Sequence, residues 1–163
     1  MAKAWSKELY VDGAKGIGID IVNELCENLR EQDKIDLEAL GHDTAFGIIM
    51  SMRLDEETWL YRNDKGELLC ILGVGKPNPG VPGRNIWMVG TDKLYDGYVR
   101  ELLFKEAQYM ITKWLICYGL LYNAVYEKNT RSINYMKRVL GAVFIPEDIV
   151  NGDKVFKQFY IGR

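Results

Sequence analysis

The segment from Leu121 to Phe144 holds the residues whose types and spacing are most informative about chemistry. It begins with a run of apolar and aromatic residues, which is typical of a strand that is covered on both faces. Asn129 follows at the position of a helix N-cap, where its side chain would accept a hydrogen bond from an amide near Arg131 or Ser132. Gly141 supplies the left-handed residue that ends such a helix. We therefore predict a buried strand, a short capped helix and a second strand.

Several other kinds of site have few residues to use. His42 is the only histidine. A Ser-His-Asp triad therefore has no second histidine to draw on, and no cluster of histidines could hold a metal. Cys26, Cys70 and Cys117 are widely spaced among apolar neighbours. This pattern suits reduced core thiols in a cytosolic compartment, and we expect neither a disulfide framework nor a metal site.

The composition is that of one ordinary soluble domain. The chain has 163 residues, of which 48% are hydrophobic, enough apolar material for a single core formed by residues 1–163. Its formal net charge of −2 creates no overall basic field, so we expect no nucleic-acid partner. The N-terminus lacks the apolar core of a secretion signal, and the longest apolar stretch is interrupted by a lysine and a glycine. We therefore expect neither secretion nor membrane insertion.

The hydrophobic periodicity predicts the elements that would position these residues. The expected strands cover residues 6–11, 58–61, 68–74, 86–89, 121–126, 142–145 and 155–161, and the expected helices cover residues 32–40, 44–54, 95–118 and two segments near 21–29 and 130–140. Gly41 and Gly119 are expected to end two of these helices, Asp43 is expected to cap a third, and residues 63–66 are expected to form a hairpin turn. The order is strand, helices, three strands, long helix, strand, short helix and two strands. It predicts an α/β or α+β layered domain.

This order and the helix after Asn129 resemble the GNAT superfamily of N-acetyltransferases. The usual pattern there is an Asn, a small residue three positions later, a Tyr seven positions later, and a Gly-Phe pair that closes the helix. Asn129 and Ser132 fit this pattern, whereas Met136 stands at the tyrosine position, Gly141 comes one residue late and Ala142 replaces the phenylalanine. The spacing is most similar to that of short GNAT-like proteins of tailed bacteriophages. The resemblance implies a mixed central sheet of about six to seven strands with helices on both faces.

The resemblance also implies an acetyl-CoA site in a V-shaped opening between the fourth and fifth strands, here residues 86–91 and 121–126. In the family, glycines before the long helix let backbone amides wrap the CoA pyrophosphate. Here Asp92 and Asp96 are natural helix caps that would compete for those amides, so an ordinary capped helix start is an equally good interpretation. The residues expected to contact the cofactor are Val89, Gly90, Thr91, Lys93 and Arg100 on the pyrophosphate side, and Asn129 and Ser132 on the pantetheine side.

The resemblance implies a tyrosine that protonates the leaving CoA thiolate from the helix after the fifth strand. Tyr135 lies one residue before that position, and one residue rotates a side chain by about 100° around a helix. We therefore expect Tyr135 to point away from the thioester unless the start of the helix shifts, and Tyr126 is the alternative donor. For both residues, a packed core aromatic is the other interpretation.

Two functions follow from the resemblance. One is transfer of an acetyl group from acetyl-CoA to a primary amine by direct attack. The other is a catalytically degenerate phage protein, in the virion or the host cytoplasm, that keeps the fold and binds a phage or host protein. The aromatic residues of the tail could form the partner surface of such a protein; they are Phe144, Phe156, Phe159 and Tyr160.

Overall fold

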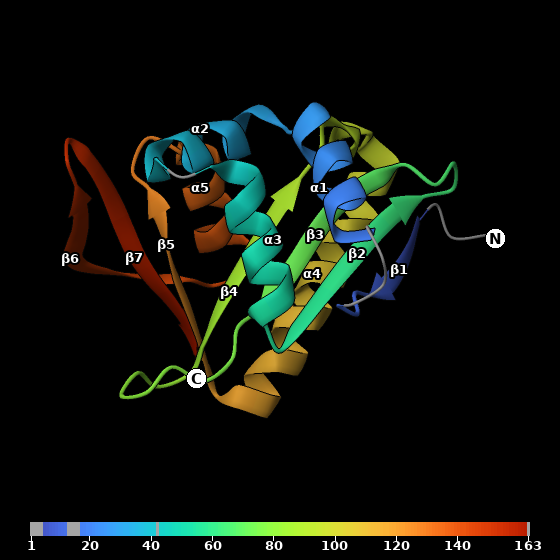
Figure 1. Ribbon diagram of the computed structural model, residues 1–163. Coiled ribbons are helices and arrows are strands. Elements are labelled where there is room, and N and C mark those ends of the chain that lie inside the picture. Colours follow the sequence, from blue (N-terminus) through green and yellow to red (C-terminus); the bar gives the residue numbers. More distant parts are fainter. Residues whose placement is uncertain (1–4, 13–16, 42, 163) are drawn as a thin grey trace.

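The computed structural model describes residues 5–12, 17–41 and 43–162, which build a mixed seven-stranded sheet flanked by helices (Figure 1). The strand order across the sheet is β1-β2-β3-β4-β5-β7-β6. In chain order the elements are β1 (Trp5–Leu9), α1 (Ile17–Glu27), α2 (Glu31–Leu40), α3 (Thr44–Leu54), β2 (Glu57–Asn63), β3 (Leu68–Val74), β4 (Arg84–Gly90), the 3₁₀ helix η1 (Asp92–Tyr95), α4 (Gly97–Tyr118), β5 (Leu120–Tyr126), α5 (Thr130–Arg138), β6 (Val143–Asn151) and β7 (Lys154–Gly162). The layered α/β architecture with a mixed sheet is as the sequence predicted.

The strands β1 to β4 form an antiparallel half of the sheet. The turn between β2 and β3 is the predicted one, because Gly66 has a φ of 80° that favours glycine. The side-chain oxygen of Asn63 accepts hydrogen bonds from the amides of Lys65 and Glu67 at 3.0 and 2.9 Å. These local bonds fix the register in which β3 enters the sheet, where every residue of the strand is buried.

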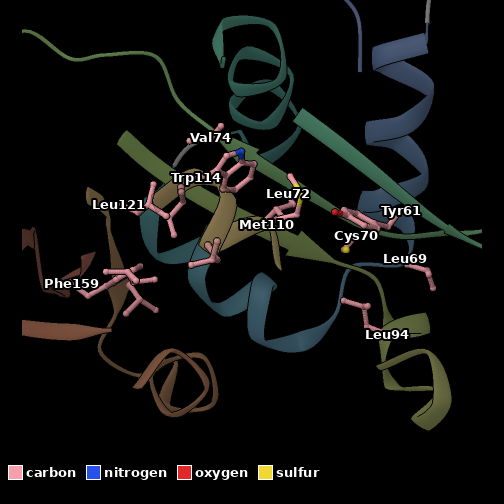
Figure 2. Close-up of a cluster of buried hydrophobic side chains, with 14 of the residues drawn as sticks. Tyr61, Leu69, Cys70, Leu72, Val74, Leu94, Met110, Trp114, Leu121 and Phe159 are labelled. Carbon is pink, nitrogen blue, oxygen red and sulfur yellow. The ribbon is translucent and has the colours of Figure 1, made fainter. Parts of the chain in front are cut away.

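Helices cover both faces of the sheet (Figure 1). On one face, α1 and α3 pack together over β2 and β3, and the fully buried side chains of Val22 and Leu25 lie at the centre of that layer. On the other face, α4 buries Trp114 and Met110 completely against the sheet (Figure 2). The central strands are therefore buried from both sides, as their continuous apolar sequences predicted.

The predicted helix ends are confirmed where they depend on one residue. Gly41 ends α2 with a φ of 71°, and Gly119 ends α4 with a φ of 78°. Asp43 caps α3, because its side-chain oxygen accepts a hydrogen bond from the amide of Phe46 at 3.2 Å. His42 lies outside the described residues.

Several boundaries differ from the predicted elements, and three of them have a clear physical reason. The long helix begins at Gly97, because the residues before it form η1, which is anchored by the buried side chain of Leu94. Leu29 lies beyond the end of α1 and forms an isolated β-bridge with Thr91. The strand β6 continues to Asn151, because it pairs with β7 at Val143 and Phe144 and again from Asp148 to Asn151.

Two predictions about side-chain environment were wrong. Cys117 is exposed on the last turn of α4, whereas Cys70 is buried as expected; both are free thiols. Phe156 and Phe159 are buried in the core, and Phe144 packs against Phe159 with ring centroids 5.5 Å apart. Most of the tail aromatics therefore stabilise the domain and do not form an exposed partner surface. No helix within the described ranges is long and apolar enough to cross a membrane.

Candidate functional site

The parallel pair of β4 and β5 opens into a gap near the middle of the sheet (Figure 1). The ladder consists of two residue pairs, Arg84 with Leu121 and Asn85 with Tyr122. The side chain of Asn123 then enters the space between the strands, where its Nδ2 donates to the carbonyl oxygen of Ile86 at 2.5 Å. A side-chain amide takes more room than a backbone ladder, so the strands diverge toward their carboxyl ends. The opening predicted between these two strands is present.

A cavity of about 830 Å³ occupies this opening. Its lining residues come from α2 and α3 on one side of the sheet and from α4 and α5 on the other. The cavity therefore connects the two faces of the sheet through the gap between β4 and β5. Its size is in the range of sites that bind small ligands and cofactors.

Helix α2 is bonded to both strands at the carboxyl end of the opening. Asp33 Oδ2 accepts a hydrogen bond from the amide of Gly90 at 2.8 Å, at the end of β4. Asp36 Oδ1 accepts one from the amide of Tyr126 at 2.9 Å, at the end of β5. The strands have separated at this point and cannot satisfy these amides, so the carboxylates of α2 replace the missing ladder.

The two carboxylates differ in their charge compensation. Asp33 is 5% exposed and receives a bond from Arg30 Nε at 2.5 Å. Burial raises the pKa of Asp33, and the charge of Arg30 opposes this effect. Burial also raises the pKa of Asp36, which forms no salt bridge with any of the described residues. Asp36 is therefore a half-buried carboxylate whose charge is balanced only by hydrogen bonds among the described residues.

We expect the substitution Asp36→Asn to stabilise the folded protein at neutral pH. Burial lifts the folded-state pKa of Asp36 above its ordinary value of 3.8, so the folded form binds more protons than the unfolded form above that pH. Stability is therefore lost as the pH rises through the window between 3.8 and the higher folded-state pKa. An asparagine can still accept from Tyr126 but carries no charge to desolvate.

Thermal unfolding of the Asp36→Asn protein at a series of pH values between about 4 and 7 measures this effect. The advantage of the variant over wild type should be largest at the neutral end and should shrink as the pH falls. Asp64→Asn, at an exposed turn position, is the matched control and should leave the curve unchanged. A variant less stable than wild type at neutral pH would show that the charge of Asp36 is favourable where it lies.

Asn129 and Ser132 connect the start of α5 to α2. The predicted cap is confirmed, since Asn129 Oδ1 accepts a hydrogen bond from the amide of Ser132 at 3.4 Å. Asn129 Nδ2 donates to the carbonyl oxygen of Gln32 at 3.0 Å, and Gln32 Nε2 donates to Ser132 Oγ at 3.3 Å. Both residues are buried and both line the cavity.

At the start of α4, no aspartate side chain among the described residues competes with a ligand for the first amides of the helix, contrary to expectation. Asp96 is the N-cap residue, but its side chain makes no capping hydrogen bond, and neither does that of Thr91 at the start of η1. Thr91 is 1% exposed, and its hydroxyl donates to the carbonyl oxygen of Leu68 at 2.7 Å. The first amides of α4 are therefore not occupied by the aspartate that precedes them.

The predicted cofactor residues divide into two groups. Four of them line the cavity: Val89, Arg100, Asn129 and Ser132. The other three, Gly90, Thr91 and Lys93, are not part of its lining. The amide of Gly90 is taken by Asp33, and Lys93 Nζ lies 3.4 Å from a carboxylate oxygen of Glu67.

Three arginines make one end of the cavity basic. Arg30 precedes α2, Arg100 lies in the first turns of α4, and Arg131 is the second residue of α5. The guanidinium of Arg131 lies 4.8 Å from the ring centroid of Tyr95 and donates to its hydroxyl at 3.4 Å. Tyr95 in turn donates to Gln32 Oε1 at 3.3 Å. Positive side chains and two helix N-termini together favour an anion at this end.

The two candidate tyrosines occupy different environments. Tyr135 lines the cavity, and its ring stacks on Phe104 with centroids 5.0 Å apart. Tyr135 was expected to point away from the thioester; its side chain lies against α4, and both Tyr135 and Met136 line the cavity. Tyr126 is absent from the cavity lining among the described residues; its ring packs against Phe156 in a cluster with Ala39.

The hydroxyl of Tyr135 is buried without a hydrogen-bond partner among the described residues. Burial raises the pKa of Tyr135 to about 12. The phenol therefore keeps its proton at neutral pH and has a free donor. A buried polar group that the protein itself leaves unpaired is a feature that needs a reason, and a ligand group in the cavity is one.

No protein-family model and no curated protein sequence matches this chain. Solved structures do match it along nearly its full length. A spermidine N-acetyltransferase from Vibrio cholerae in complex with CoA and spermine has a TM-score of 0.62 at 12% identity, covering 98% of this chain and 95% of that one. A GCN5-related N-acetyltransferase from Kribbella flavida has a TM-score of 0.62 at 14% identity, covering 98% of both chains. An aminoglycoside N(6′)acetyltransferase from Legionella pneumophila has a TM-score of 0.66 at 10% identity, covering 99% and 94%.

The chain has the GNAT fold. At identities of 10 to 14%, the structural likeness establishes only the arrangement of the backbone. The roles of individual residues must be argued from the geometry of the cavity itself. In this GNAT fold, the gap between β4 and β5, the two helix N-termini and the cavity lie together.

Sequence reasoning predicted helix α2 but not its part in the site. Gln32, Asp33 and Asp36 are the residues that tie it to the strand ends and to α5. Their spacing of one and four residues places them on one side of a helix, where they interrupt the apolar positions. Polar residues on the inner face of a predicted helix are a signal that could have identified them. Arg131 was also missed, although its place directly after the predicted cap suggested a basic group at the start of α5.

Proposed function

We propose that this protein is an acetyl-CoA-dependent N-acetyltransferase that transfers the acetyl group to an amine by direct attack. The observation that carries the proposal is the cavity in the gap between β4 and β5, which runs from a basic end to the opposite face of the sheet. Such a passage lets an anionic cofactor and an amine approach each other from two sides. The neighbours with this fold include N-acetyltransferases of spermidine and of aminoglycosides, one of them in complex with CoA.

The basic end of the cavity fits the pyrophosphate of CoA. Arg100 and Arg131 supply positive charge, and the first amides of α4 are free of a side-chain cap. Asn129 and Ser132 lie between this end and the gap, so they would contact the pantetheine chain. Val89 would contribute an apolar wall. We assign to Arg131 the pyrophosphate contact that was predicted for Lys93, because the ammonium of Lys93 lies 3.4 Å from a carboxylate oxygen of Glu67.

Tyr135 is the residue placed to donate a proton in this site. Acetyl-CoA supplies a thioester: the neutral amine attacks its carbonyl carbon, the carbon–sulfur bond breaks, and the thiolate takes up a proton from Tyr135. The resulting phenolate of Tyr135 takes up the proton that the acetylated nitrogen loses. Tyr135 lines the cavity, and its buried hydroxyl keeps its proton and has no partner among the described residues that would hold it. General acid catalysis of this kind contributes about 10²- to 10⁴-fold to a rate.

A second function is favoured by one observation. Asp33 and Asp36 already occupy the amides at the ends of β4 and β5, where the divergence of the strands would otherwise leave donors for a ligand. A GNAT-fold domain that has lost the chemistry and binds another protein, such as a phage virion or host protein, would have this arrangement. Failure to bind acetyl-CoA is the result that would favour it.

Acetyl transfer is tested by incubating the purified protein with acetyl-CoA and a panel of amines. Product should be followed by mass, because the exposed Cys117 would react with thiol reagents used to detect released CoA. We expect acetylated amine to form in proportion to protein. Arg131→Glu should raise the KM for acetyl-CoA about tenfold or more, since one charged hydrogen bond contributes roughly 1.5 to 3 kcal/mol.

Arg138→Glu is the matched control, because it makes the same change on an exposed residue at the other end of α5, outside the cavity lining. Its KM for acetyl-CoA should stay near that of wild type. Absence of product with every amine, from folded protein at saturating acetyl-CoA, would contradict the proposed function.

A further inference from the structure

The two ends of the cavity differ in charge and in apolar character. The basic end lies at the starts of α4 and α5, as described above. The other end lies between α2, α3 and the hairpin of β6 and β7. Its apolar lining residues are Leu37, Leu40, Ile48, Trp87, Ile149 and Phe156. The arginines that line the cavity among the described residues all lie at the basic end, and no lysine lines it.

On the basis of the proposed function, we propose that the acceptor is an amine with one ammonium group and a large apolar body, such as an arylalkylamine. Asp36 binds its ammonium and accepts the proton that the nitrogen must lose before it attacks the thioester, and the side chains of Leu37, Leu40 and Trp87 contact its apolar body.

The position of Asp36 supports the ammonium site. It lines the cavity, and one of its oxygens is held by the amide of Tyr126 at 2.9 Å. No cation among the described residues forms a salt bridge with it. A half-buried carboxylate without a cation is costly, and a ligand ammonium that pairs with it would recover much of that cost.

The surroundings of Asp36 support the apolar body. Leu37 and Leu40 follow Asp36 at one and four residues on α2, so they flank the carboxylate on the same side of the helix. Leu40 is 38% exposed and Ile149 is 46% exposed, which are large values for apolar side chains that line a cavity. Contact with an apolar ligand would remove this surface from water.

The same lining disfavours amines that carry several charges. A second ammonium placed beyond Asp36 would lie among leucine, isoleucine and tryptophan side chains. The other carboxylates that line the cavity among the described residues are already engaged: Asp33 pairs with Arg30, Glu106 pairs with Lys7, and the exposed Asp43 accepts the capping bond from the amide of Phe46. Ser51 and Asn85 are neutral. An unpaired charge next to apolar walls is a repulsive element, which gives specificity against polyamines and aminoglycosides.

The test compares kcat/KM for 2-phenylethylamine, spermidine and kanamycin at saturating acetyl-CoA. We expect 2-phenylethylamine to exceed both by about tenfold or more, the size of effect that an unpaired buried ammonium produces. The substitution Asp36→Asn should raise the KM for 2-phenylethylamine about tenfold or more while the calorimetric Kd for acetyl-CoA stays unchanged. A kcat/KM for spermidine or kanamycin that equals or exceeds that for 2-phenylethylamine would overturn the inference.

The substitution Leu40→Asp places a second carboxylate at the apolar end. It should raise the ratio of kcat/KM for spermidine to that for 2-phenylethylamine about tenfold or more. Leu54→Asp is the matched control, because Leu54 is 60% exposed at the end of α3 and does not line the cavity. An unchanged ratio in Leu40→Asp would overturn the placement of the apolar body.

A separate measurement distinguishes this inference from the proposed function. If no amine is acetylated, the enzyme proposal fails, and binding of 2-phenylethylamine alone then decides the inference. The indole N–H signal of Trp87 in a nitrogen–proton correlation spectrum should shift with the amine in wild type and should not shift in Asp36→Asn. No shift in wild type at millimolar amine would overturn the ammonium site.

Discussion

Replacing Tyr135 by phenylalanine should lower kcat for acetyl transfer about 100-fold. Tyr135 lines the cavity, and its hydroxyl keeps its proton because burial raises the pKa of Tyr135 to about 12. The same burial makes the phenol a weak acid, so the effect should lie at the low end of the range for general acids. The Kd for acetyl-CoA should change little, because the ring and its contact with Phe104 remain.

Stability separates this role of Tyr135 from packing. The hydroxyl has no partner among the described residues, so its removal costs no internal hydrogen bond and should not lower the melting temperature. Tyr109→Phe is the matched control, because Tyr109 is 59% exposed on α4 and does not line the cavity. Full kcat in the Tyr135→Phe protein would show that this hydroxyl takes no part in the reaction.

Replacing Asp33 by alanine should lower the free energy of unfolding by about 3 to 5 kcal/mol. Asp33 accepts bonds from Arg30 and from the amide of Gly90, and its side chain is 7% exposed. Its removal leaves Arg30, whose side chain is 13% exposed, without its carboxylate, and leaves a buried amide without an acceptor. The tie between α2 and the end of β4 is lost at the same time.

Urea unfolding measures this loss. Glu31→Ala removes an exposed carboxylate two residues earlier on the same helix and should change stability by no more than about 0.5 kcal/mol. A loss below about 1 kcal/mol in Asp33→Ala would mean that Arg30 finds another partner or reaches water. The bond to Gly90 would then not be what holds α2 across the opening.

The predictions that succeeded depend on bonds between near neighbours in the sequence. Asn129 and Asp43 cap helices through amides three residues later, and Gly66 permits the φ that the turn requires. The divergence of β4 and β5 followed from the resemblance to the GNAT superfamily, and the apolar runs of both strands agreed with it. Element order and this local chemistry were therefore enough to predict the fold.

The parts of the site that were missed depend on contacts between distant residues. Asp33 and Gly90 are 57 positions apart, and Asp36 and Tyr126 are 90 apart, so no local spacing indicates either bond. The orientation of Tyr135 depends on how α5 sits against Phe104 of α4. Counting residues from Asn129 gave its angle on the helix but not the position of the helix relative to the gap.

The central claim is that the cavity between β4 and β5 holds acetyl-CoA, and calorimetric titration of acetyl-CoA into the purified protein tests it most directly. We expect a Kd in the micromolar range, about −8 kcal/mol, and binding at least about tenfold weaker in Arg131→Glu but not in Arg138→Glu. Absence of binding at millimolar acetyl-CoA, with the protein folded, would contradict the claim and would leave a GNAT fold that serves as a binding module.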